Sequence, residues 1–302
     1  MIVSCQNSKD STNQRGWFFY YKKGVENMKK KLSLLVLAVA TAALTLVGCG
    51  SSKSDNSEDN VFRVGMEAGY APFNWTQNDD SNGAVKIDGG SEYAGGYDVE
   101  IAKKIADGLG KELVIVKTEW DGLVPALTSG KIDAIIAGMS PTAERKETID
   151  FSDIYYNSDL VMLVKKGGVY DSAETLKDFS GAKITAQLNT FHYSVIDQIP
   201  DVNKVEAMDN FPAMRVALES GVIDGYVTEK PEALSAQAAN ENFKMIEFKE
   251  GFETSEEDTA IAVGLQKDSE LKDKVNEALK GISEEERLSI MEEALKNQPA
   301  AQ

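Results

Sequence analysis

The stretch Ala134-Ile-Ile-Ala-Gly-Met-Ser-Pro-Thr-Ala-Glu-Arg145 predicts a buried strand that turns directly into a helix. Its first four residues are apolar and partly β-branched, as in a strand that is covered on both faces. Gly138 permits a tight turn or a close backbone approach. Ser140 or Thr142 is suited to cap the following helix, with Pro141 in its first turn. The stretch therefore predicts a strand–turn–helix unit in which the helix starts at the carboxyl end of the strand.

The same turn carries the groups of a carboxylate-binding site. Amide groups at a helix start, the hydroxyl of Ser140 and the guanidinium of Arg145 are able to converge on one point. The amide dipoles favour an anion, and a planar guanidinium binds both oxygens of a carboxylate. The alternative is an ordinary turn with a solvated Arg145, and the rest of the chain has to decide between the two.

The first 60 residues predict a leader and a tether. Residues 28–31 are basic, residues 32–47 are mostly Leu, Ala and Val, and Gly48 precedes Cys49. This order is typical of a signal peptide, and its apolar core is too short for a comfortable membrane span. The end of the segment resembles the lipobox of bacterial lipoproteins, in which the cysteine is lipidated and becomes the mature N-terminus. A simple signal peptide or membrane anchor is the alternative.

We interpret residues 1–27 as an artefactual extension, because Met28 begins an ideal signal sequence. Residues 28–48 are then the lipoprotein signal peptide, with Cys49 as the lipidation site. Residues 49–60 form a polar, low-complexity tether that is expected to be disordered, since it has nothing to bury.

Composition excludes several classes of function. The sequence contains no cysteine after Cys49, so the fold has to rely on its core without disulfides. Removing the first 48 residues, with seven basic and two acidic side chains, makes the formal net charge of −17 more negative by five. Such a surface repels nucleic acid and anionic lipid headgroups. Any membrane attachment must therefore come from a lipid at Cys49.

Beyond the tether, predicted strands alternate with predicted helices, which indicates right-handed βαβ units and a mainly parallel α/β sheet. Strands are expected at residues 61–65, 113–117, 132–137, 160–164, 183–186, 222–228 and 260–265. Two segments resemble each other, Leu127-Thr-Ser-Gly-Lys-Ile-Asp-Ala134 and Leu218-Glu-Ser-Gly-Val-Ile-Asp-Gly225. We interpret the repeat as two α/β lobes of similar plan with a ligand between them at the carboxyl ends of the strands. Asp133 and Asp224, within the repeat, are expected to hold turns.

Several motifs occur together at spacings that resemble the polar-amino-acid family of solute-binding proteins of ABC importers. They are Tyr70-Ala-Pro-Phe73, Gly96-Tyr-Asp98, Leu123-Val-Pro-Ala-Leu127, Gly130-Lys-Ile-Asp133, Gly138-Met-Ser-Pro-Thr-Ala-Glu-Arg145 and Ile149-Asp-Phe-Ser152. The resemblance spans about residues 61–295. It implies a two-lobed periplasmic-binding-protein-like fold of type II, with two crossing hinge strands. One lobe is expected at 61–157 plus 256–302 and the other at 161–250.

The resemblance also implies a ligand site. Arg145 and Ser140 are expected to bind an α-carboxylate, with main-chain groups near Gly138, Thr190 and Phe191. Glu229 is expected to bind the α-ammonium, in place of the family's usual aspartate. The expected aromatic walls are Tyr70 and Trp120, and Glu67 lies where some members of the family carry a carboxylate that reads the side chain. Gln187, at a position that is sometimes a lysine, is also expected to line the site. Asn189-Thr-Phe191 departs from the family's Gly-Thr/Ser-Thr/Ser, so the second lobe is expected to hold the carboxylate less strongly.

The resemblance implies a monomeric, lipid-anchored receptor on the outer face of the cytoplasmic membrane, of the Gram-positive cell-surface type. It would deliver a polar L-amino acid to ABC permease subunits. The aromatic walls and Glu67 favour arginine or lysine, glutamine remains open, and acidic amino acids are disfavoured. The alternatives are an enzyme that dehydrates cyclic acids and a sensory module. No motif for a metal, a cofactor or catalysis is evident, and His192 is expected on a helix surface.

Overall fold

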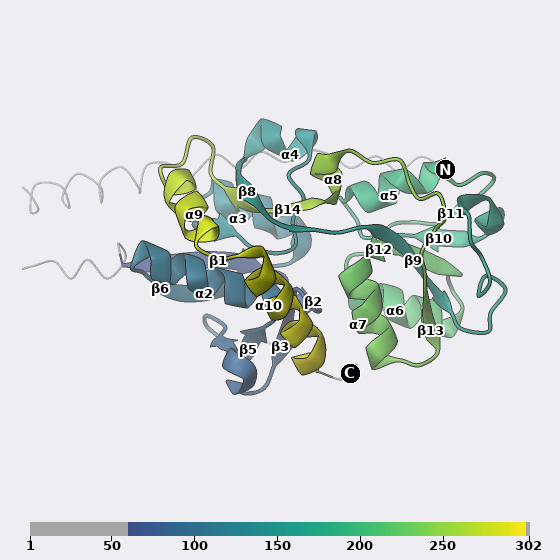
Figure 1. The fold of residues 1–302 in the computed structure, drawn as a ribbon, viewed down its shortest axis with the longest axis horizontal. Coiled ribbons are helices and arrows are strands. Elements are labelled where there is room, and N and C mark those ends of the chain that lie inside the picture. Colours follow the sequence, from purple (N-terminus) through teal and green to yellow (C-terminus); the bar gives the residue numbers. More distant parts are fainter. Residues whose placement is uncertain (1–59, 300–302) are drawn as a thin grey trace, which may run out of the picture. The chain divides into compact units, whose positions relative to one another are not determined.

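The computed structural model describes residues 60–299, which lie in one compact unit of the chain (Figure 1). The expected extension, the signal peptide, Cys49 and nearly all of the tether lie outside the described residues. Two five-stranded sheets organise the described part, and most of the helices pack around them.

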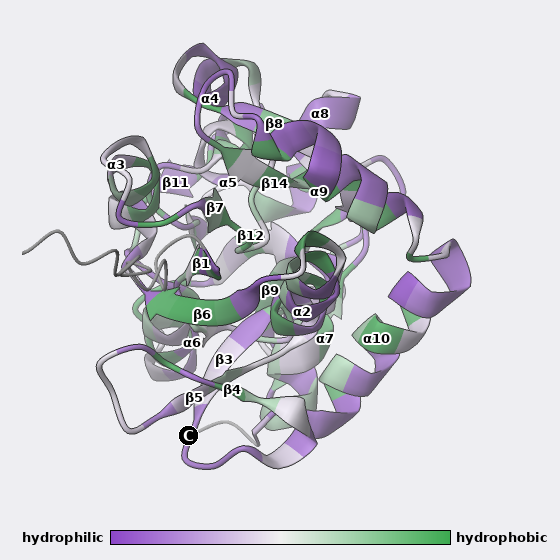
Figure 2. Ribbon diagram, turned by 90° about the vertical axis from the view of Figure 1, so that its left-hand side faces the viewer, coloured by the Kyte–Doolittle hydropathy of each residue, from purple (hydrophilic) through white to green (hydrophobic). Residues whose placement is uncertain are grey.

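The first sheet has an inner strand, β1, that pairs in parallel with both neighbours. Its strands, in spatial order, are β6 (Glu112–Lys117), β1 (Val61–Met66), β7 (Ala134–Ile135), β14 (Ala260–Leu265) and β8 (Asp150–Asn157). Strand β1 is parallel to β6 and β7, and β14 is antiparallel to β7. Every residue of β14 is buried, and β6 is strongly hydrophobic in Figure 2. The sheet is therefore mainly parallel, with one reversed strand.

The second sheet repeats this plan. Its strands, in spatial order, are β11 (Asn203–Lys204), β10 (Lys183–Thr185), β12 (Gly225–Glu229), β9 (Leu160–Lys165) and β13 (Phe243–Ile246). Strand β10 is parallel to β11 and β12, and β9 is antiparallel to β12. The two lobes predicted from the repeat are thus built on sheets of the same strand arrangement.

A small antiparallel sheet extends the first lobe. It contains β2 (Gly69–Tyr70), β3 (Asn74–Gln77), β5 (Tyr93–Gly95) and β4 (Val85–Lys86), with the 3-10 turn η1 (Ser81–Gly83). The chain crosses between the lobes twice, from β8 to β9 and from β13 to β14, the second time through α8 (Glu256–Thr259).

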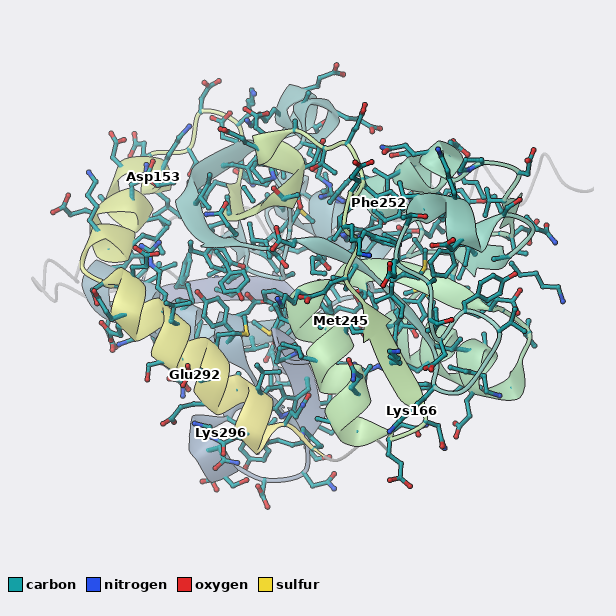
Figure 3. All side chains as sticks on the ribbon, turned by 45° about the vertical axis from the view of Figure 1, so that its right-hand side comes forward. Asp153, Lys166, Met245, Phe252, Glu292 and Lys296 are labelled. Carbon is teal, nitrogen blue, oxygen red and sulfur yellow. The ribbon has the colours of Figure 1, made fainter. Side chains whose placement is uncertain are left out.

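The helices follow the predicted alternation. Those of the first lobe are α2 (Tyr97–Leu109), α3 (Leu123–Thr128) after the turn η2 (Trp120–Gly122), α4 (Ala143–Thr148), α9 (Leu271–Lys280) and α10 (Glu284–Asn297). Those of the second are α5 (Phe191–Val195), α6 (Phe211–Ser220) and α7 (Lys230–Ala239), with the turns η3 (Leu176–Phe179) and η4 (Ile196–Gln198). Helix α10 reaches α7 of the other lobe, with Glu292 and Lys296 on its exposed side (Figure 3).

The structure refines the predicted strand–turn–helix unit. The strand β7 is two residues long, shorter than the predicted 132–137. Thr142 caps α4, and its hydroxyl accepts a hydrogen bond from the Arg145 amide at 3.4 Å. Of the two candidates, Thr142 and not Ser140 is therefore the residue that caps this helix. Gly138 has a φ of +63°, which explains the glycine at the turn.

The two aspartates of the repeat make equivalent contacts. A carboxylate oxygen of Asp133 accepts from the amide of Arg63 at 2.7 Å, and one of Asp224 accepts from the amide of Lys183 at 2.8 Å. Each aspartate thereby ties the loop before β7 or β12 to the start of the neighbouring parallel strand. Both hold turns, as expected, and the repeat has a structural cause.

Replacing these aspartates by alanine is predicted to weaken the fold at equivalent points. We expect Asp133→Ala to lower the free energy of unfolding by about 1–2 kcal/mol, because a backbone amide loses its charged acceptor. The loss should be smaller for Asp224→Ala, whose contact is more exposed. Urea unfolding followed by circular dichroism measures the change. Asp107→Ala, at an exposed position of α2, is the control, and equal stabilities for all three variants would contradict the assignment.

Candidate functional site: a pocket between the two sheets

A narrow pocket lies where corresponding strands of the two sheets end. It is lined by Tyr70, Trp120, Gly138, Ser140, Arg145, Gln187, Thr190, Phe191, His192 and Glu229. Gly138, Ser140 and Arg145 follow β7, and Glu229 is the last residue of β12. The remaining residues come from β2, η2, and the segment from the end of β10 to α5. Nine of the ten residues predicted for the site therefore border one pocket, and Glu67 lies outside its lining.

Arg145 supplies the positive charge of the pocket. Its Nη1 donates to the carbonyl of Ser140 at 2.9 Å, and its Nη2 donates to the carbonyl of Asn189 at 3.0 Å. The guanidinium carbon lies 5.1 Å from the ring centroid of Trp120, a cation–π geometry. Burial lowers the pKa of Arg145 to about 10, so the group stays charged at neutral pH. Carbonyls and an aromatic face hold the guanidinium in place and leave it without a carboxylate partner among the described residues.

Glu229 supplies the negative charge. It is 3% exposed, and one of its oxygens accepts a hydrogen bond from the Tyr70 hydroxyl. Its other oxygen lies 3.0 Å from Nε2 of His192. Burial acts to raise the pKa of Glu229, but His192 and the Tyr70 hydroxyl outweigh it and hold that pKa below its usual range. The carboxylate is therefore ionised at neutral pH, and the pocket presents a buried anion and a half-buried cation.

His192 corrects the expectation of a residue on a helix surface. Its side chain is 5% exposed and borders the pocket. Helix α5 is only five residues long, and the ring of His192 packs at 4.3 Å, centroid to centroid, from that of Phe191. The sequence around His192 contains no motif for catalysis or metal binding, and this absence was the basis of the expectation. The position of His192 in the sequence could have indicated the pocket, because His192 directly follows Thr190 and Phe191, which were predicted for the site.

Glu67 and Gln187 form a contact between the lobes behind the pocket. Nε2 of Gln187 donates to a carboxylate oxygen of Glu67 at 3.0 Å and to the carbonyl of Asp209 at 3.1 Å. Glu67 borders a separate, wider groove of about 570 Å³. Burial raises the pKa of Glu67 to about 7, with further help from Glu119 and Asp121, while Gln187 opposes the shift. Near neutral pH this carboxyl is therefore divided between its two protonation states.

Tyr70 is fixed by stacking and by the turn at Gly138. Its ring stacks on Phe211 with centroids 4.4 Å apart and planes 8° apart, and it lies 4.9 Å from Phe73. A Cβ at position 138 would lie 2.6 Å from Tyr70 Cε1, so only glycine allows this approach. Phe211, at the start of α6, is a supporting residue that sequence reasoning missed, because nothing local marks it.

The buried Asp98 supports the same turn from behind. It accepts hydrogen bonds from Asn74 and from the Tyr155 hydroxyl, both at 2.8 Å. Burial raises the pKa of Asp98 to about 6, and hydrogen bonds that include one from the Gly138 amide oppose the shift. The Gly96-Tyr-Asp98 motif thus positions the pocket without lining it.

Asn189 joins the lobes at the rim of the pocket. Its backbone carbonyl accepts from Arg145, and its side-chain amide donates to Asp121 at 2.8 Å. Its φ is +55°, a conformation that asparagine and glycine adopt most readily. The next residue, Thr190, donates its hydroxyl to the Gln187 carbonyl at 2.7 Å. The departure from glycine noted in the sequence therefore adds a side-chain contact that crosses the cleft.

Residues 60–299 contain no helix long and apolar enough to cross a membrane. The same residues contain no cluster of three or more His, Cys, Asp or Glu side chains arranged to hold a metal ion.

Comparison with known proteins identifies the class. Residues 62–295 match the model of the bacterial extracellular solute-binding proteins, family 3, and the chain belongs to this family. It is 30% identical over 262 residues to an arginine-binding extracellular protein, ArtP, of Bacillus subtilis, covering 85% of this chain and 94% of that protein. It is also 30% identical to the ABC transporter glutamine-binding protein GlnH of the same organism, covering 90% of this chain and all of the relative.

A solved structure has the same fold. It is an amino acid ABC transporter substrate-binding protein from Streptococcus pneumoniae, bound to L-arginine. The two share 30% sequence identity and superpose with a TM-score of 0.70, over 79% of this chain and 95% of that one. The predicted two-lobed α/β fold and the predicted family are confirmed.

Gly138→Ala is predicted to disturb the pocket. We expect a loss of about 1–3 kcal/mol in the free energy of unfolding, because the new Cβ meets the Tyr70 ring and the residue keeps a positive φ. Thermal unfolding measures it. Gly110→Ala is the matched control, since its φ of +65° is nearly the same and no atom lies within 4 Å of its Cβ position. Equal losses in the two variants would show that the Tyr70 contact is unimportant.

Proposed function

We propose that this protein is an extracytoplasmic receptor that binds a polar L-amino acid between its two lobes and delivers it to an ABC importer permease. The observation that carries the proposal is the presence of two oppositely charged side chains, the half-buried Arg145 and the buried Glu229, on the same pocket. A free amino acid is a zwitterion, and it needs an anion and a cation at separate points.

The residues have complementary roles in this proposal. Arg145 and the hydroxyl of Ser140 receive the α-carboxylate, with main-chain groups near Gly138, Thr190 and Phe191. Glu229 receives the α-ammonium, and Tyr70 and Trp120 enclose the ligand. Charge-assisted hydrogen bonds contribute about 1.5–3 kcal/mol each. Several of them, less the cost of ordering the ligand, account for the roughly −8 kcal/mol of a micromolar complex.

Glu67 and Gln187 favour a cationic ligand side chain. The Glu67 carboxylate accepts a hydrogen bond from Gln187, and Glu119 and Asp121 add negative potential at this carboxylate. A guanidinium or ammonium of arginine or lysine would replace the Gln187 amide as the partner of Glu67. Glutamine is the second candidate, because Gln187 pairs with an amide as well as with a carboxyl. The arginine- and glutamine-binding relatives are consistent with both ligands.

We further propose that the mature chain is a monomer, held at the outer face of the cytoplasmic membrane by a lipid on Cys49, after removal of residues 28–48. The order of basic, apolar and small residues before Cys49 supports this. The proposal is one of binding and delivery without catalysis and without a cofactor, in keeping with a family of solute-binding transport proteins.

The proposed function predicts stabilisation by amino acids. In a thermal-shift screen of the twenty L-amino acids, we expect one chemical group to raise the melting temperature, since a ligand at one hundred times Kd adds about 2.7 kcal/mol of stability. Arg145→Ala should weaken binding of the best ligand by at least roughly 100-fold, through loss of two charge-assisted bonds. Arg63→Ala is the control. A screen without any shift would refute the proposal.

The pKa of Glu67 predicts how the selectivity changes with pH. Below about pH 7 the carboxyl is protonated, and a bound cation needs it ionised, so a cationic ligand must displace a proton there. The ratio of L-arginine to L-glutamine affinity should therefore rise between pH 6 and pH 8, by up to about tenfold per pH unit below the pKa. Titration calorimetry measures it, and Glu67→Gln should abolish the rise. A ratio that is independent of pH in the native protein would exclude Glu67 as the side-chain reader.

A further inference from the structure

The proposed recognition of an amino acid leaves one pocket residue without a task, His192. It is the only histidine of the chain, it is buried, and it borders the same pocket as Arg145 and Glu229. Its Nε2 lies 3.0 Å from a Glu229 oxygen, yet within residues 60–299 neither ring nitrogen has an aligned hydrogen bond. Buried polar groups are nearly always paired, so this ring needs an explanation.

The groups around His192 define its electrostatic setting. Glu229, at the end of β12, is the ionised carboxylate closest to the ring. Tyr70 on β2 is neutral, because burial and Glu229 raise its pKa well above the usual value. Burial also raises the pKa of Tyr156 on β8. Asp197, on the adjoining turn η4, is exposed and pairs with Lys204 on β11 at 2.9 Å.

Arg145 on α4 completes this setting. Its two terminal nitrogens point at the carbonyls of Ser140 and Asn189, so its contacts do not include Glu229. Among the described residues, the imidazole is the basic group within ion-pair distance of Glu229. The ring therefore stands where a cation that neutralises the carboxylate would stand.

We propose that His192 is an internal counter-cation that pairs with Glu229 in the absence of ligand. When the α-ammonium of the ligand binds to Glu229, it replaces the charge of His192, and the imidazolium loses its proton. This inference rests on the proposed function, because it assigns the ammonium to Glu229. In the absence of ligand, imidazolium and carboxylate form a buried ion pair. When the ammonium reaches Glu229, two cations would share one carboxylate in a pocket that also holds Arg145, and like charges at such distances disfavour each other.

The proton balance follows directly. The ligand enters as a zwitterion and brings its own ammonium, Glu229 stays ionised, and the imidazolium loses one proton to the solvent. Each ligand that binds therefore releases one proton at any pH where His192 is charged. A receptor of this kind releases its amino acid more readily at an acidic surface.

A structural role for His192 makes a different prediction. If the ring only fills space near Phe191, ligand binding releases no proton from His192. The dependence of ligand affinity on pH would then be the same before and after replacement of His192 by glutamine. His192→Gln is therefore the informative variant, because it keeps a polar side chain of similar reach and removes the titration. Glu67 titrates in the same range, so both forms are compared in a Glu67→Gln background.

The first experiment counts protons. L-arginine and L-glutamine are titrated into the untagged mature chain by calorimetry, in buffers of different ionisation enthalpy, between about pH 5.5 and 8. In the Glu67→Gln background we expect close to one proton released per ligand at the acidic end, and none after His192→Gln. We also expect His192→Gln to flatten the affinity profile. Equal proton release with and without His192 would overturn the inference.

The second experiment observes the ring without any ligand. Because the chain contains one histidine, a ¹⁵N-labelled sample without a histidine tag gives a single imidazole signal that reports protonation. We expect the imidazolium fraction at a given pH to fall after Glu229→Gln, and to fall in the native chain on saturation with ligand. An imidazole signal that is unchanged by Glu229→Gln would refute the ion pair. If no amino acid binds, the proposed function fails, and this signal alone decides whether the pair exists.

Discussion

A half-buried guanidinium and a buried carboxylate that border one pocket without pairing with each other are the constraint on which the rest of this structure depends. Taking either charge out of water is costly unless it finds hydrogen-bonding partners. Arg145 has two carbonyls and the face of Trp120, whereas Glu229 has the Tyr70 hydroxyl and His192. The separation keeps both charges available to a third molecule that carries the opposite pair.

The repeated fold explains how these charges come to face each other. Glu229 is the last residue of β12, Arg145 lies on α4, the helix that follows β7, and the two strands occupy equivalent positions in the two sheets. Asp133 and Asp224 hold the entry to these strands in the same way. Cross-lobe contacts then cluster around the pocket: Tyr70 with Glu229, Gln187 with Glu67, and Asn189 with both Arg145 and Asp121. Each of these contacts between the lobes thus involves at least one residue that borders the pocket or its partner across the cleft.

Much of this could be predicted from the sequence because the signals were local. The alternation of strands and helices, the glycine at position 138 and the repeat around Asp133 each depend on a few neighbouring residues. The burial of His192 could not be predicted, since it arises from the packing of β12 against a five-residue helix. The stacking of Phe211 on Tyr70 is likewise a contact between distant segments. Glu67 was predicted for the site; it lies outside the pocket lining and accepts a hydrogen bond from Gln187, a contact between segments that are distant in the sequence.

The central claim is that Arg145 and Glu229 bind the two ends of one free amino acid. The most direct test is a crystal structure of the mature chain with the amino acid that stabilises it most. The account predicts the ligand carboxylate within hydrogen-bonding distance of the Arg145 guanidinium and the Ser140 hydroxyl, and the ammonium at Glu229. A ligand bound with its carboxylate away from Arg145, or outside this pocket, would contradict it.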